Sequence, residues 1–399
     1  MTKDEWITAL QEELQSILHY WMHYAVDHRY GGFAGKIDHA DTVYPLAPKG
    51  VVLNTRILWS FSAAYRLTGN GAYLLYADRA FRYLCDHFLD QQYGGVYWTV
   101  DYQGRPLDTK KQVYAQAFAL YAFTEYYKSC RQESALQLAV GLYRLIEQHS
   151  FDTNRTGYFE AFDRTWKPLA DMRLSEKDAN EQKTLNTHLH VMEAYSNLFR
   201  IFPDRQLGQS LRMLLHNFLH DFINPGTGHL NLFFGQDWQL KSSLVSFGHD
   251  IEAAWLLPEA ALALQDDLLL AACNRSAIQL AEASIPAVDA DGGLWYEWSP
   301  PEGWVKEKHW WPQAEAMVGF FNAWEISGKE KYLRYAINSW TFIKKYLVDG
   351  QTGEWLWGID AGYAVMLHED KAGLWKCPYH NSRACIEMIK RLENITTLP

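Results

Sequence analysis

Histidine, carboxylate and tryptophan side chains recur in short segments whose spacing suits acid–base chemistry. His249 and Glu252 lie one helical turn apart, and His380 follows Trp375 and Pro378. An unperturbed imidazole has a pKa of ~6.5, so it exchanges protons near neutral pH. These segments predict general acid–base catalysis. A capping cluster at the start of a helix is the alternative explanation for His249 and Glu252.

A second segment, Asn186-Thr187-His188-Leu189-His190, contains a His-x-His pattern. In a strand both imidazoles would share a face and could bind a metal ion, but on a helix they diverge by roughly 200°. We therefore expect His190, which shares a helical face with Asn186, to enter a pocket and His188 to be structural. Because the chain also lacks a His-Glu-x-x-His segment, we expect no obligatory metal.

Aromatic residues accompany these polar groups. Trp311 stands four residues before Glu315, and Trp375 lies in a loop that Pro378 separates from the helix beginning near Tyr379. The faces of tryptophan rings can stack on sugar rings, and aromatic residues make up 15% of the chain. A carbohydrate platform is therefore predicted at Trp375, with simple loop packing as the alternative.

Composition narrows the class of protein. The net charge is −10, so no basic stripe is available for nucleic acid or an anionic membrane. The five cysteines form no Cys-x-x-Cys pair, which favours a reducing, cytoplasmic setting. The first residues read as an amphipathic helix rather than a secretory signal, and no apolar stretch reaches ~18 residues.

The elements that must position these residues follow an internal repeat. A glycine loop signature, Tyr-Gly-Gly-Phe in its first copy, occurs six times, and its final glycines are residues 32, 95, 157, 228, 293 and 353. The intervals are 63, 62, 71, 65 and 60 residues. Glycine permits the backbone conformations of a tight reversal, and the residues after it suggest a short extended piece. The pattern predicts six similar units.

Each interval holds two helical patterns. Segment 52–67 is apolar nearly all round, which is typical of a buried helix, whereas segment 72–89 is amphipathic. The same alternation continues through the chain, with buried helices starting near 112, 184, 248, 310 and 379 and amphipathic ones near 133–149, 206–220, 264–284 and 330–347. With a first helix near 4–25 there are twelve. We predict an all-α, closed (α/α)6 barrel, a single domain over residues 1–399, with an open solenoid as the alternative.

The starts of the inner helices should surround one mouth of this barrel. Polar residues there are out of place in a core, because a buried charge is costly unless it is paired. A polar pocket explains them, and its expected members are Arg56, Tyr114, Gln116, Asn186, His190, His249, Glu252, Trp311, Glu315, His380 and Arg383.

Five segments resemble the cellobiose 2-epimerase family, within the N-acylglucosamine 2-epimerase superfamily. They are NTRILWSF (54–61), NTHLHVMEAY (186–195), SFGHDIEAAWLL (246–257), KHWWPQAEAMVGF (308–320) and GLWKCPYHNSRACIEM (373–388). The resemblance implies an (α/α)6 barrel, in agreement with the repeat.

The resemblance also implies residue roles. His249 and His380 match two catalytic histidines that act on opposite faces of the sugar C2, His190 matches a third active-site histidine, and Arg56 matches an arginine near O1 and O2. The expected substrate-binding residues are Glu252, Trp311, Glu315 and Trp375, with Asn186, Asp178 and Tyr114 as further polar contacts.

The implied reaction is a cofactor-independent isomerisation of a small disaccharide. The enzyme would interconvert glucose and mannose at the reducing end of β-1,4-linked disaccharides. Ring opening creates an aldehyde that acidifies the C2 proton, one histidine removes this proton, and the other reprotonates the cis-enediolate from the opposite face. We expect a cytoplasmic monomer, with a homodimer as the alternative, and no nucleic-acid or membrane partner.

Other functions remain open on sequence grounds. Within the fold, an N-acylglucosamine 2-epimerase and an aldose–ketose isomerase use related chemistry. An (α/α)6-barrel glycoside hydrolase would need two carboxylates that flank the scissile bond, and a non-enzymatic carbohydrate-binding protein would not need three histidines.

Overall fold

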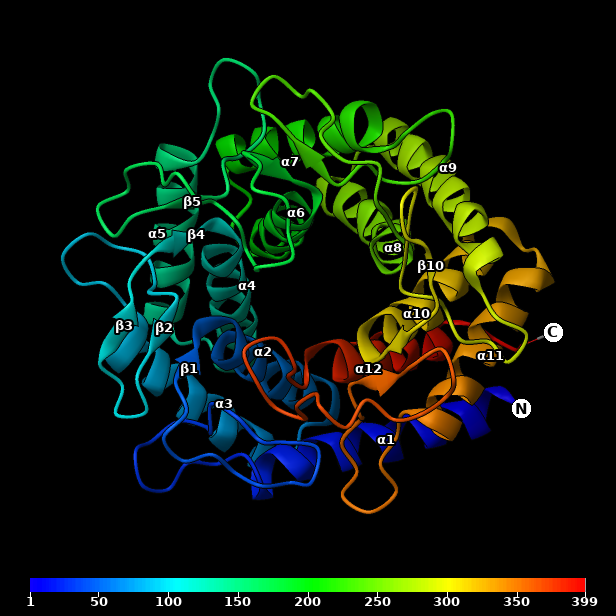
Figure 1. The fold of residues 1–399 in the computed structure, drawn as a ribbon, viewed down its shortest axis with the longest axis horizontal. Helices are drawn as coiled ribbons and strands as arrows, with labels where there is room; N and C mark the ends of the chain where they lie inside the picture. Colours follow the sequence, from blue (N-terminus) through cyan, green and yellow to red (C-terminus); the bar gives the residue numbers. More distant parts are fainter. Residues whose placement is uncertain (399) are drawn as a thin grey trace.

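Two concentric rings of helices make up the molecule (Figure 1), a computed structural model that describes residues 1–398. The inner ring consists of α2 (Val51–Thr68), α4 (Val113–Cys130), α6 (Leu185–Phe199), α8 (Phe247–Leu264), α10 (Trp310–Ser327) and α12 (Tyr379–Asn394). The outer ring consists of α1 (Lys3–His23), α3 (Gly71–Tyr83), α5 (Glu133–His149), α7 (Arg205–Asn217), α9 (Asp267–Ser284) and α11 (Glu330–Tyr346). The predicted (α/α)6 barrel of twelve helices is confirmed for these residues.

Burial separates the two rings as the sequence predicts. Every residue of α4 from Val113 to Tyr126 is buried, because the helix packs against neighbours on all sides. The outer helix α11 instead buries a single stripe, which includes Tyr332, Ala336 and Ile343 at helical spacing. Short π-helical turns, Leu84–Phe88 and Phe218–Phe222, extend α3 and α7.

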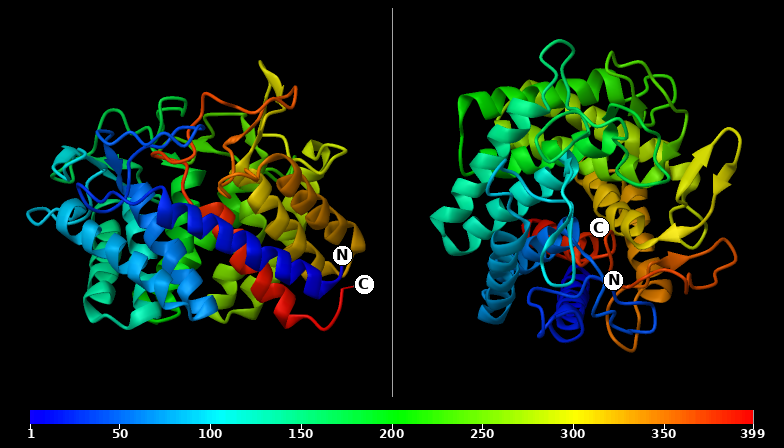
Figure 2. Two further views of the ribbon diagram at one scale, coloured as in Figure 1. Left: turned by 90° about the horizontal axis from the view of Figure 1, so that it is seen from below. Right: turned by 60° about the vertical axis from the view of Figure 1, so that its left-hand side comes forward.

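The two ends of the barrel differ in the length of their connections. Four inner helices end at a left-handed residue and turn at once into the next outer helix; Gly69 and Gly328 have φ of 70° and 68°, while Arg131 and Gln265 take the same conformation. The connections from outer to inner helices are long and gather on one side of the molecule (Figure 2). They form the mouth that the inner helices enter.

Short strands hold these long connections together, and their pairing is not evident from the sequence. The strands are β1 (Lys49–Gly50), β2 (Thr99–Val100), β3 (Pro106–Asp108), β4 (Lys111–Gln112), β5 (Ala161–Phe162), β6 (Lys183–Thr184), β7 (Phe233–Phe234), β8 (Val245–Ser246), β9 (Glu297–Ser299), β10 (Gly303–Val305), β11 (Lys308–His309) and β12 (Gly358–Ile359). A strand that precedes an inner helix pairs antiparallel with the strand of the next unit, as β4 does with β5. Neighbouring units are thereby joined around the mouth.

An ion pair with a buried lysine fixes the glycine loop to the start of the inner helix in four units. The pairs are Lys49–Asp27 (2.7 Å), Lys111–Asp90 (3.0 Å), Lys183–Asp152 (2.9 Å) and Lys308–Asp289 (3.2 Å). In the fourth unit, Asn224 replaces the aspartate and Val245 replaces the lysine. That unit therefore has neither charge of the pair. The loops are therefore held by repeated local contacts as well as by the strands.

The first and last helices close the ring. α1 packs on α12, and Lys3 Nζ donates a hydrogen bond to the Ile395 carbonyl at 3.1 Å near the two termini (Figure 2). The helices therefore form a closed ring and not an open solenoid. Within residues 1–398, no helix has the length and apolar character that crossing a bilayer requires.

Candidate active site

A cavity of about 460 Å³ opens at the mouth, among the starts of the inner helices. The predicted site residues that line it are Arg56, Tyr114, Asp178, Asn186, His190, His249, Glu252, Trp311, Trp375 and His380. Glu315 differs, because it lies beneath His380 with 1% of its surface exposed. Residues from widely separated segments are thus brought to one cavity.

Four histidines line the cavity, and three of them, His190, His249 and His380, have Nδ1 held by a fixed partner, whereas His309 has Nε2 2.9 Å from Glu307 Oε2. His190 Nδ1 lies 3.0 Å from Glu193 Oε2, His249 Nδ1 lies 2.8 Å from Ser246 Oγ, and His380 Nδ1 lies 2.7 Å from Glu315 Oε1. An imidazole with Nδ1 engaged has Nε2 left for a ligand. The three rings are therefore oriented to use Nε2 in the cavity.

Burial keeps these imidazoles neutral. It lowers the pKa of His249 to about 3, helped by the nearby His190. The pKa of His380 also falls, because of burial and then the positive charges of Arg56 and Arg383. A neutral imidazole can accept a proton, so both His249 and His380 are suited to act as bases at neutral pH.

Arg56 supplies a positive charge beside the histidines. Its guanidinium donates to the Tyr114 hydroxyl at 2.6 Å and lies over the rings of Phe118 (4.2 Å) and Tyr379 (4.9 Å). Among residues 1–398 no carboxylate forms an ion pair with it. A buried guanidinium held by aromatic rings and a hydroxyl can stabilise negative charge that develops on a ligand oxygen.

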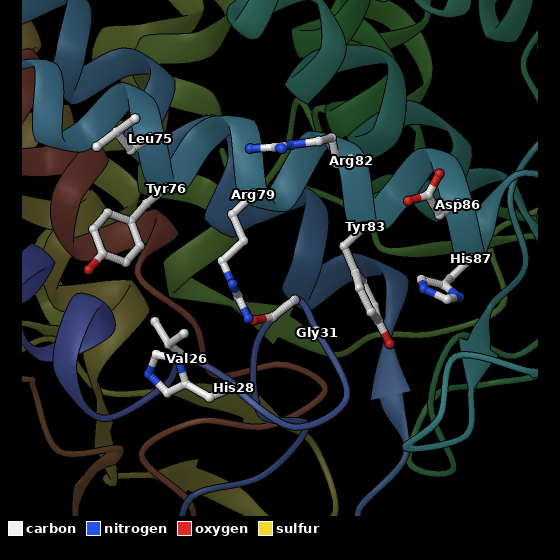
Figure 3. A pocket seen from close by; sticks show the side chains of 11 residues that line it. Val26, His28, Gly31, Leu75, Tyr76, Arg79, Arg82, Tyr83, Asp86 and His87 are labelled. Carbon is white, nitrogen blue, oxygen red and sulfur yellow. The ribbon is translucent and has the colours of Figure 1, made fainter.

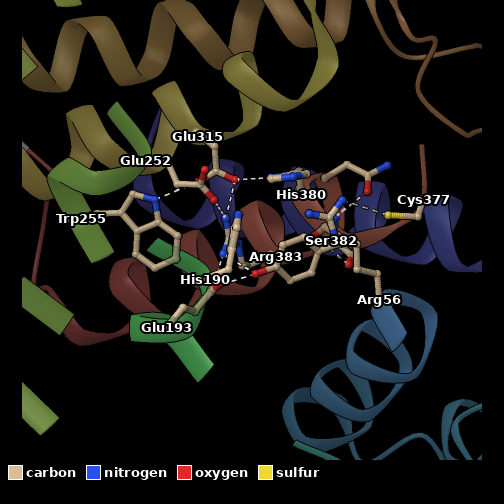
Figure 4. A network of polar contacts seen from close by, with 12 residues as sticks. Arg56, His190, Glu193, Glu252, Trp255, Glu315, Cys377, His380, Ser382 and Arg383 are labelled. Atoms are coloured by element: carbon tan, nitrogen blue, oxygen red, sulfur yellow. Dashed lines mark hydrogen bonds and ion pairs between the residues drawn. The ribbon is translucent and has the colours of Figure 1, made fainter. Parts of the chain in front are cut away.

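An ionic cluster lies directly beneath the cavity (Figure 4). Arg383 NH2 donates to Glu252 Oε1 and to Glu315 Oε1, each at 2.6 Å, and Arg383 NH1 donates to Glu193. Glu252, Glu315 and His380 also offer donor atoms within 4.8 Å of one another, the spacing of a metal site. The guanidinium of Arg383 already provides the cation between the two carboxylates. The expectation of metal independence stays a prediction.

Trp311 lies between the two histidine-bearing helices. Its ring centroid is 4.9 Å from that of His249 and 5.7 Å from that of His380. A Cβ atom at Gly248 would come within 2.3 Å of the Trp311 ring, so glycine there makes room for the indole. Trp311 thus sets the spacing of the two imidazoles.

The outer part of the cavity contains residues that the sequence did not reveal. Tyr296 and Glu297 line it from the β9 region, and Lys177 Nζ donates to the Tyr296 hydroxyl at 2.6 Å across the mouth. Trp375 packs against Trp98 and Tyr114, with centroids 5.8 and 6.0 Å apart. No local motif marks Tyr296, because the loop fold alone brings it to the cavity.

The predicted pocket needs correction at Arg383, which lies beneath the cavity, and at Gln116. Gln116 does not line the cavity: its side chain bonds the backbone of Val96 at 2.7 and 2.9 Å, as Gln313 does with Leu294. Glu252 pairs with Arg383 from across the barrel, while Ser246 holds His249. The helical spacing of His249 and Glu252 did not predict either partner.

His188 is structural, as expected. Its Nδ1 lies 2.6 Å from the Thr184 carbonyl, and its Nε2 accepts from the Tyr158 backbone amide at 2.8 Å. Asp250 occupies the equivalent helical position and accepts from the Leu230 amide at 2.8 Å. In α4, α6, α8 and α10 the fourth residue therefore fixes the adjoining glycine loop rather than entering the cavity.

A second hollow lies on the outside of the barrel, between α3 and the first glycine loop (Figure 3). It measures about 570 Å³, and two of its polar side chains have structural partners: Arg79 Nε donates to the Gly32 carbonyl at 2.8 Å, and His87 Nδ1 lies 3.1 Å from the Gly104 carbonyl oxygen. Tyr83 packs directly against Gly32. The histidines and the ionic cluster all belong to the mouth cavity instead, which is the candidate active site.

Comparison with known proteins identifies the family of this chain. The N-acylglucosamine 2-epimerase family matches residues 31–384. A cellobiose 2-epimerase from Bacteroides fragilis is 48% identical over 95% of this chain and 97% of its own length, and one from Dictyoglomus turgidum is 38% identical over 92% and 93%. The structure of a cellobiose 2-epimerase from Bacillus thermoamylovorans superimposes with a TM-score of 0.93 at 38% identity, covering 97% of this chain and 100% of that one. The chain therefore belongs to the N-acylglucosamine 2-epimerase family and is an isomerase of the epimerase class.

Proposed function

We propose that this enzyme interconverts glucose and mannose at the reducing end of cellobiose and related β-1,4-linked disaccharides. The names of the most similar relatives favour this substrate class. The observation that carries the proposal is the pair of neutral imidazoles, His249 and His380, placed on α8 and α12 around one cavity. Two bases from different helices can address opposite faces of one carbon.

The reaction begins on the open-chain sugar. The C1 aldehyde acidifies the C2 proton, and Nε2 of one histidine removes it to give a cis-enediolate. Nε2–H of the other histidine then protonates C2 from the opposite face, and the C1 carbonyl forms again. In the reverse direction the two histidines exchange roles.

Arg56 supplies the electrostatic part of the mechanism. Its guanidinium donates to the Tyr114 hydroxyl at 2.6 Å, and both groups lie in the same cavity as the two bases. We assign them to O1 and O2 of the enediolate, where negative charge develops only after proton removal. His190, held by Glu193, is assigned to a hydrogen bond with the same part of the sugar.

Further cavity residues are assigned to substrate binding. Trp311 and Trp375 offer indole faces for the two sugar rings, and Asn186 and Asp178 offer polar atoms at the rim. Because these groups and both bases come from one chain, a monomer suffices for the reaction. No step above needs a redox cofactor or a metal ion.

A glycoside hydrolase is the contrasting function for this type of barrel. Inverting hydrolysis needs two carboxyl groups about 6.5–9.5 Å apart on either side of the bond. Here Glu252 and Glu315 both receive hydrogen bonds from one atom, Arg383 NH2, and Glu315 lies out of the cavity. Glu315 is thus placed to hold His380 rather than to flank a scissile bond.

Incubation with cellobiose, followed by chromatographic separation of the sugars, tests the proposal. We expect glucosyl-mannose as the product, and the same equilibrium mixture when the reaction starts from glucosyl-mannose. Free glucose would indicate a hydrolase, and a ketose as the main product would indicate an aldose–ketose isomerase. Faster turnover of N-acetylglucosamine than of cellobiose would overturn the disaccharide assignment.

A further inference from the structure

The two carboxylates beneath the cavity form a pair around a single donor. Glu252 comes from α8 and Glu315 from α10, each 1% exposed, and both accept from NH2 of Arg383 on α12. The Glu315 Oε1 atom that accepts from Arg383 also lies 2.7 Å from His380 Nδ1 (Figure 4). The pair is therefore connected to one of the two proposed bases, on the side of the ring that faces away from the cavity.

The charges around Arg383 do not balance if every carboxyl group is ionised. Glu193, Glu252 and Glu315 surround this one guanidinium, while Arg56 is engaged with Tyr114 instead. Burial opposes ionisation of all three carboxyl groups, yet Arg383 and the His190 hydrogen bond hold the pKa of Glu193 at about 2. Three carboxylates against one guanidinium would leave a net charge of −2, and with Glu193 ionised the unbalanced negative charge falls on Glu252 and Glu315.

The surroundings favour a proton on this pair. Burial and the charge of Glu315 raise the pKa of Glu252 to about 8, and burial also raises the pKa of Glu315. The other titratable or charged groups that face the cluster, from α2, α4, α6, α8 and α12, are Arg56, Tyr114, Tyr121, His190, Glu193, His249, Tyr379, His380 and Arg383. Since His249 and His380 are both neutral at rest, the proton that one of them gives to C2 must be replaced from another group.

We propose that Glu252 and Glu315 share one proton in the resting enzyme, and that this proton is delivered to C2 of the sugar through His380. The inference rests on the proposed epimerase function and identifies its proton source. Glu252 and Glu315 are positioning residues in this scheme, because they act on the sugar only through the imidazole.

The proton balance closes over one turnover. His249 Nε2 takes the C2 proton and becomes an imidazolium, and the bonding electrons pass into the enediolate. The shared proton moves from Glu315 to His380 Nδ1, the Nε2 proton of His380 forms the new C2–H bond, and the C1=O bond is restored. The charge gained by His249 equals the charge lost by the carboxyl pair, so the site keeps its total charge.

The enzyme must then return a proton to the pair. Water can approach the pair from the end of the barrel opposite the mouth. A further cavity of about 750 Å³ opens at the end of the barrel opposite the mouth, and its lining includes Arg383, Glu193 and Trp255. Trp255 Nε1 donates to Glu315 Oε2 at 2.9 Å, so this cavity reaches the groups that hold the pair. Solvent protons can thus reload the carboxyl pair while His249 loses its proton.

Replacement of Glu252 by glutamine tests the proposal in D2O. Glu252→Gln keeps the shape and an acceptor for Arg383 but cannot share a proton with Glu315. We expect epimerisation of cellobiose to slow by about 10²-fold, whereas His249 still exchanges C2–H of the epimer that it faces. The ratio of C2 exchange to epimerisation therefore rises at least about tenfold, and Glu252→Asp, which retains a carboxyl group, keeps the ratio near that of the wild type.

A matched control is available on two neighbouring inner helices. Glu125 of α4 is buried, pairs with Arg66 of α2 and lines neither cavity, so Glu125→Gln should leave both rates unchanged. If Glu252→Gln lowers exchange and epimerisation in parallel, Glu252 is merely structural and the proposal is wrong. If the wild type neither epimerises cellobiose nor exchanges its C2 proton, the proposed function itself fails.

The wild-type enzyme provides a test that does not depend on the folding of any variant. Because the pair must be protonated to reload His380, kcat/KM for epimerisation should fall as the pH rises through about 8, the pKa of Glu252. Exchange of the C2 proton by His249, which needs no proton from the pair, should continue. Undiminished epimerisation well above that pH would overturn the proposal.

Discussion

At the scale of single residues, His190, His249 and His380 owe their roles to the group that holds Nδ1. Glu193 holds His190, a hydroxyl holds His249, and Glu315 holds His380, so otherwise similar rings face different proton environments. The sequence predicted which residues approach the cavity, because helical spacing fixes neighbours on one helix. It did not predict that Glu252 pairs with Arg383, 131 residues away, because such partners depend on the closed ring.

The lowered histidine pKa values predict that kcat/KM declines only at unusually low pH. A base with its pKa at about 3 stays neutral well below pH 6.5, so kcat/KM should remain constant as the pH falls through ~6.5 and decline only at lower pH. Initial rates with cellobiose across this range, at constant ionic strength, provide the measurement. An acid limb centred at ~6.5 or above would contradict the account.

The Glu252–Glu315–His380 cluster leads to a prediction about metal removal. Because Arg383 donates to both carboxylates, dialysis against a chelator should leave cellobiose epimerisation within about twofold of the untreated rate. The comparison needs a sample carried through the same dialysis without chelator. Loss of activity that a divalent ion restores would show that a metal, rather than the guanidinium alone, occupies this cluster.

At the scale of elements, each unit repeats the same arrangement of loop, short strand and inner helix. In α4, α6, α8 and α10 the fourth residue binds the glycine loop, and the second or sixth residue lines the cavity, as do Tyr114, His190, Glu252 and Trp311. Helix positions and burial could be predicted from periodicity. The pairing of the short strands could not be predicted, because strands of two or three residues are too short to show a periodic pattern. The recurring lysine before the inner helix and aspartate before the glycines were a usable signal that sequence reasoning overlooked.

The fourth unit suggests a double substitution in the first. Lys49→Val alone leaves the Asp27 carboxylate without its buried partner and should destabilise the fold by on the order of 3 kcal/mol. Lys49→Val with Asp27→Asn reproduces the Asn224 and Val245 pair found in unit four and should recover a large part of this loss. Denaturant unfolding of the two variants and the wild type measures both effects. Equal stability of the single and double variants would show that the charge pair is not the cause.

At the scale of the whole molecule, closure of six units brings segments from the entire chain to one cavity. Closure could be predicted from the number and length of the repeats, and with it the gathering of inner-helix starts at one mouth. The ionic cluster around Arg383 and the cavity at the far end of the barrel could not be predicted. They arise where side chains from α6, α8, α10 and α12 meet near the barrel axis. His249 and His380 begin helices separated by one inner helix, α10, so their side chains approach the cavity from different directions.

Deuterium wash-in at C2 by the variants His249→Asn and His380→Asn tests the two-base mechanism most directly. Each variant should lose net epimerisation by at least about 10²-fold in both directions, because one face of C2 has no acid or base. Each should still exchange the C2 proton of one epimer, since the surviving histidine can remove and return a proton on its own face. NMR in D2O with glucose-type and mannose-type disaccharides should therefore give complementary labelling, one epimer per variant. Epimerisation by either variant at close to the wild-type rate would contradict the account and indicate a single mobile base.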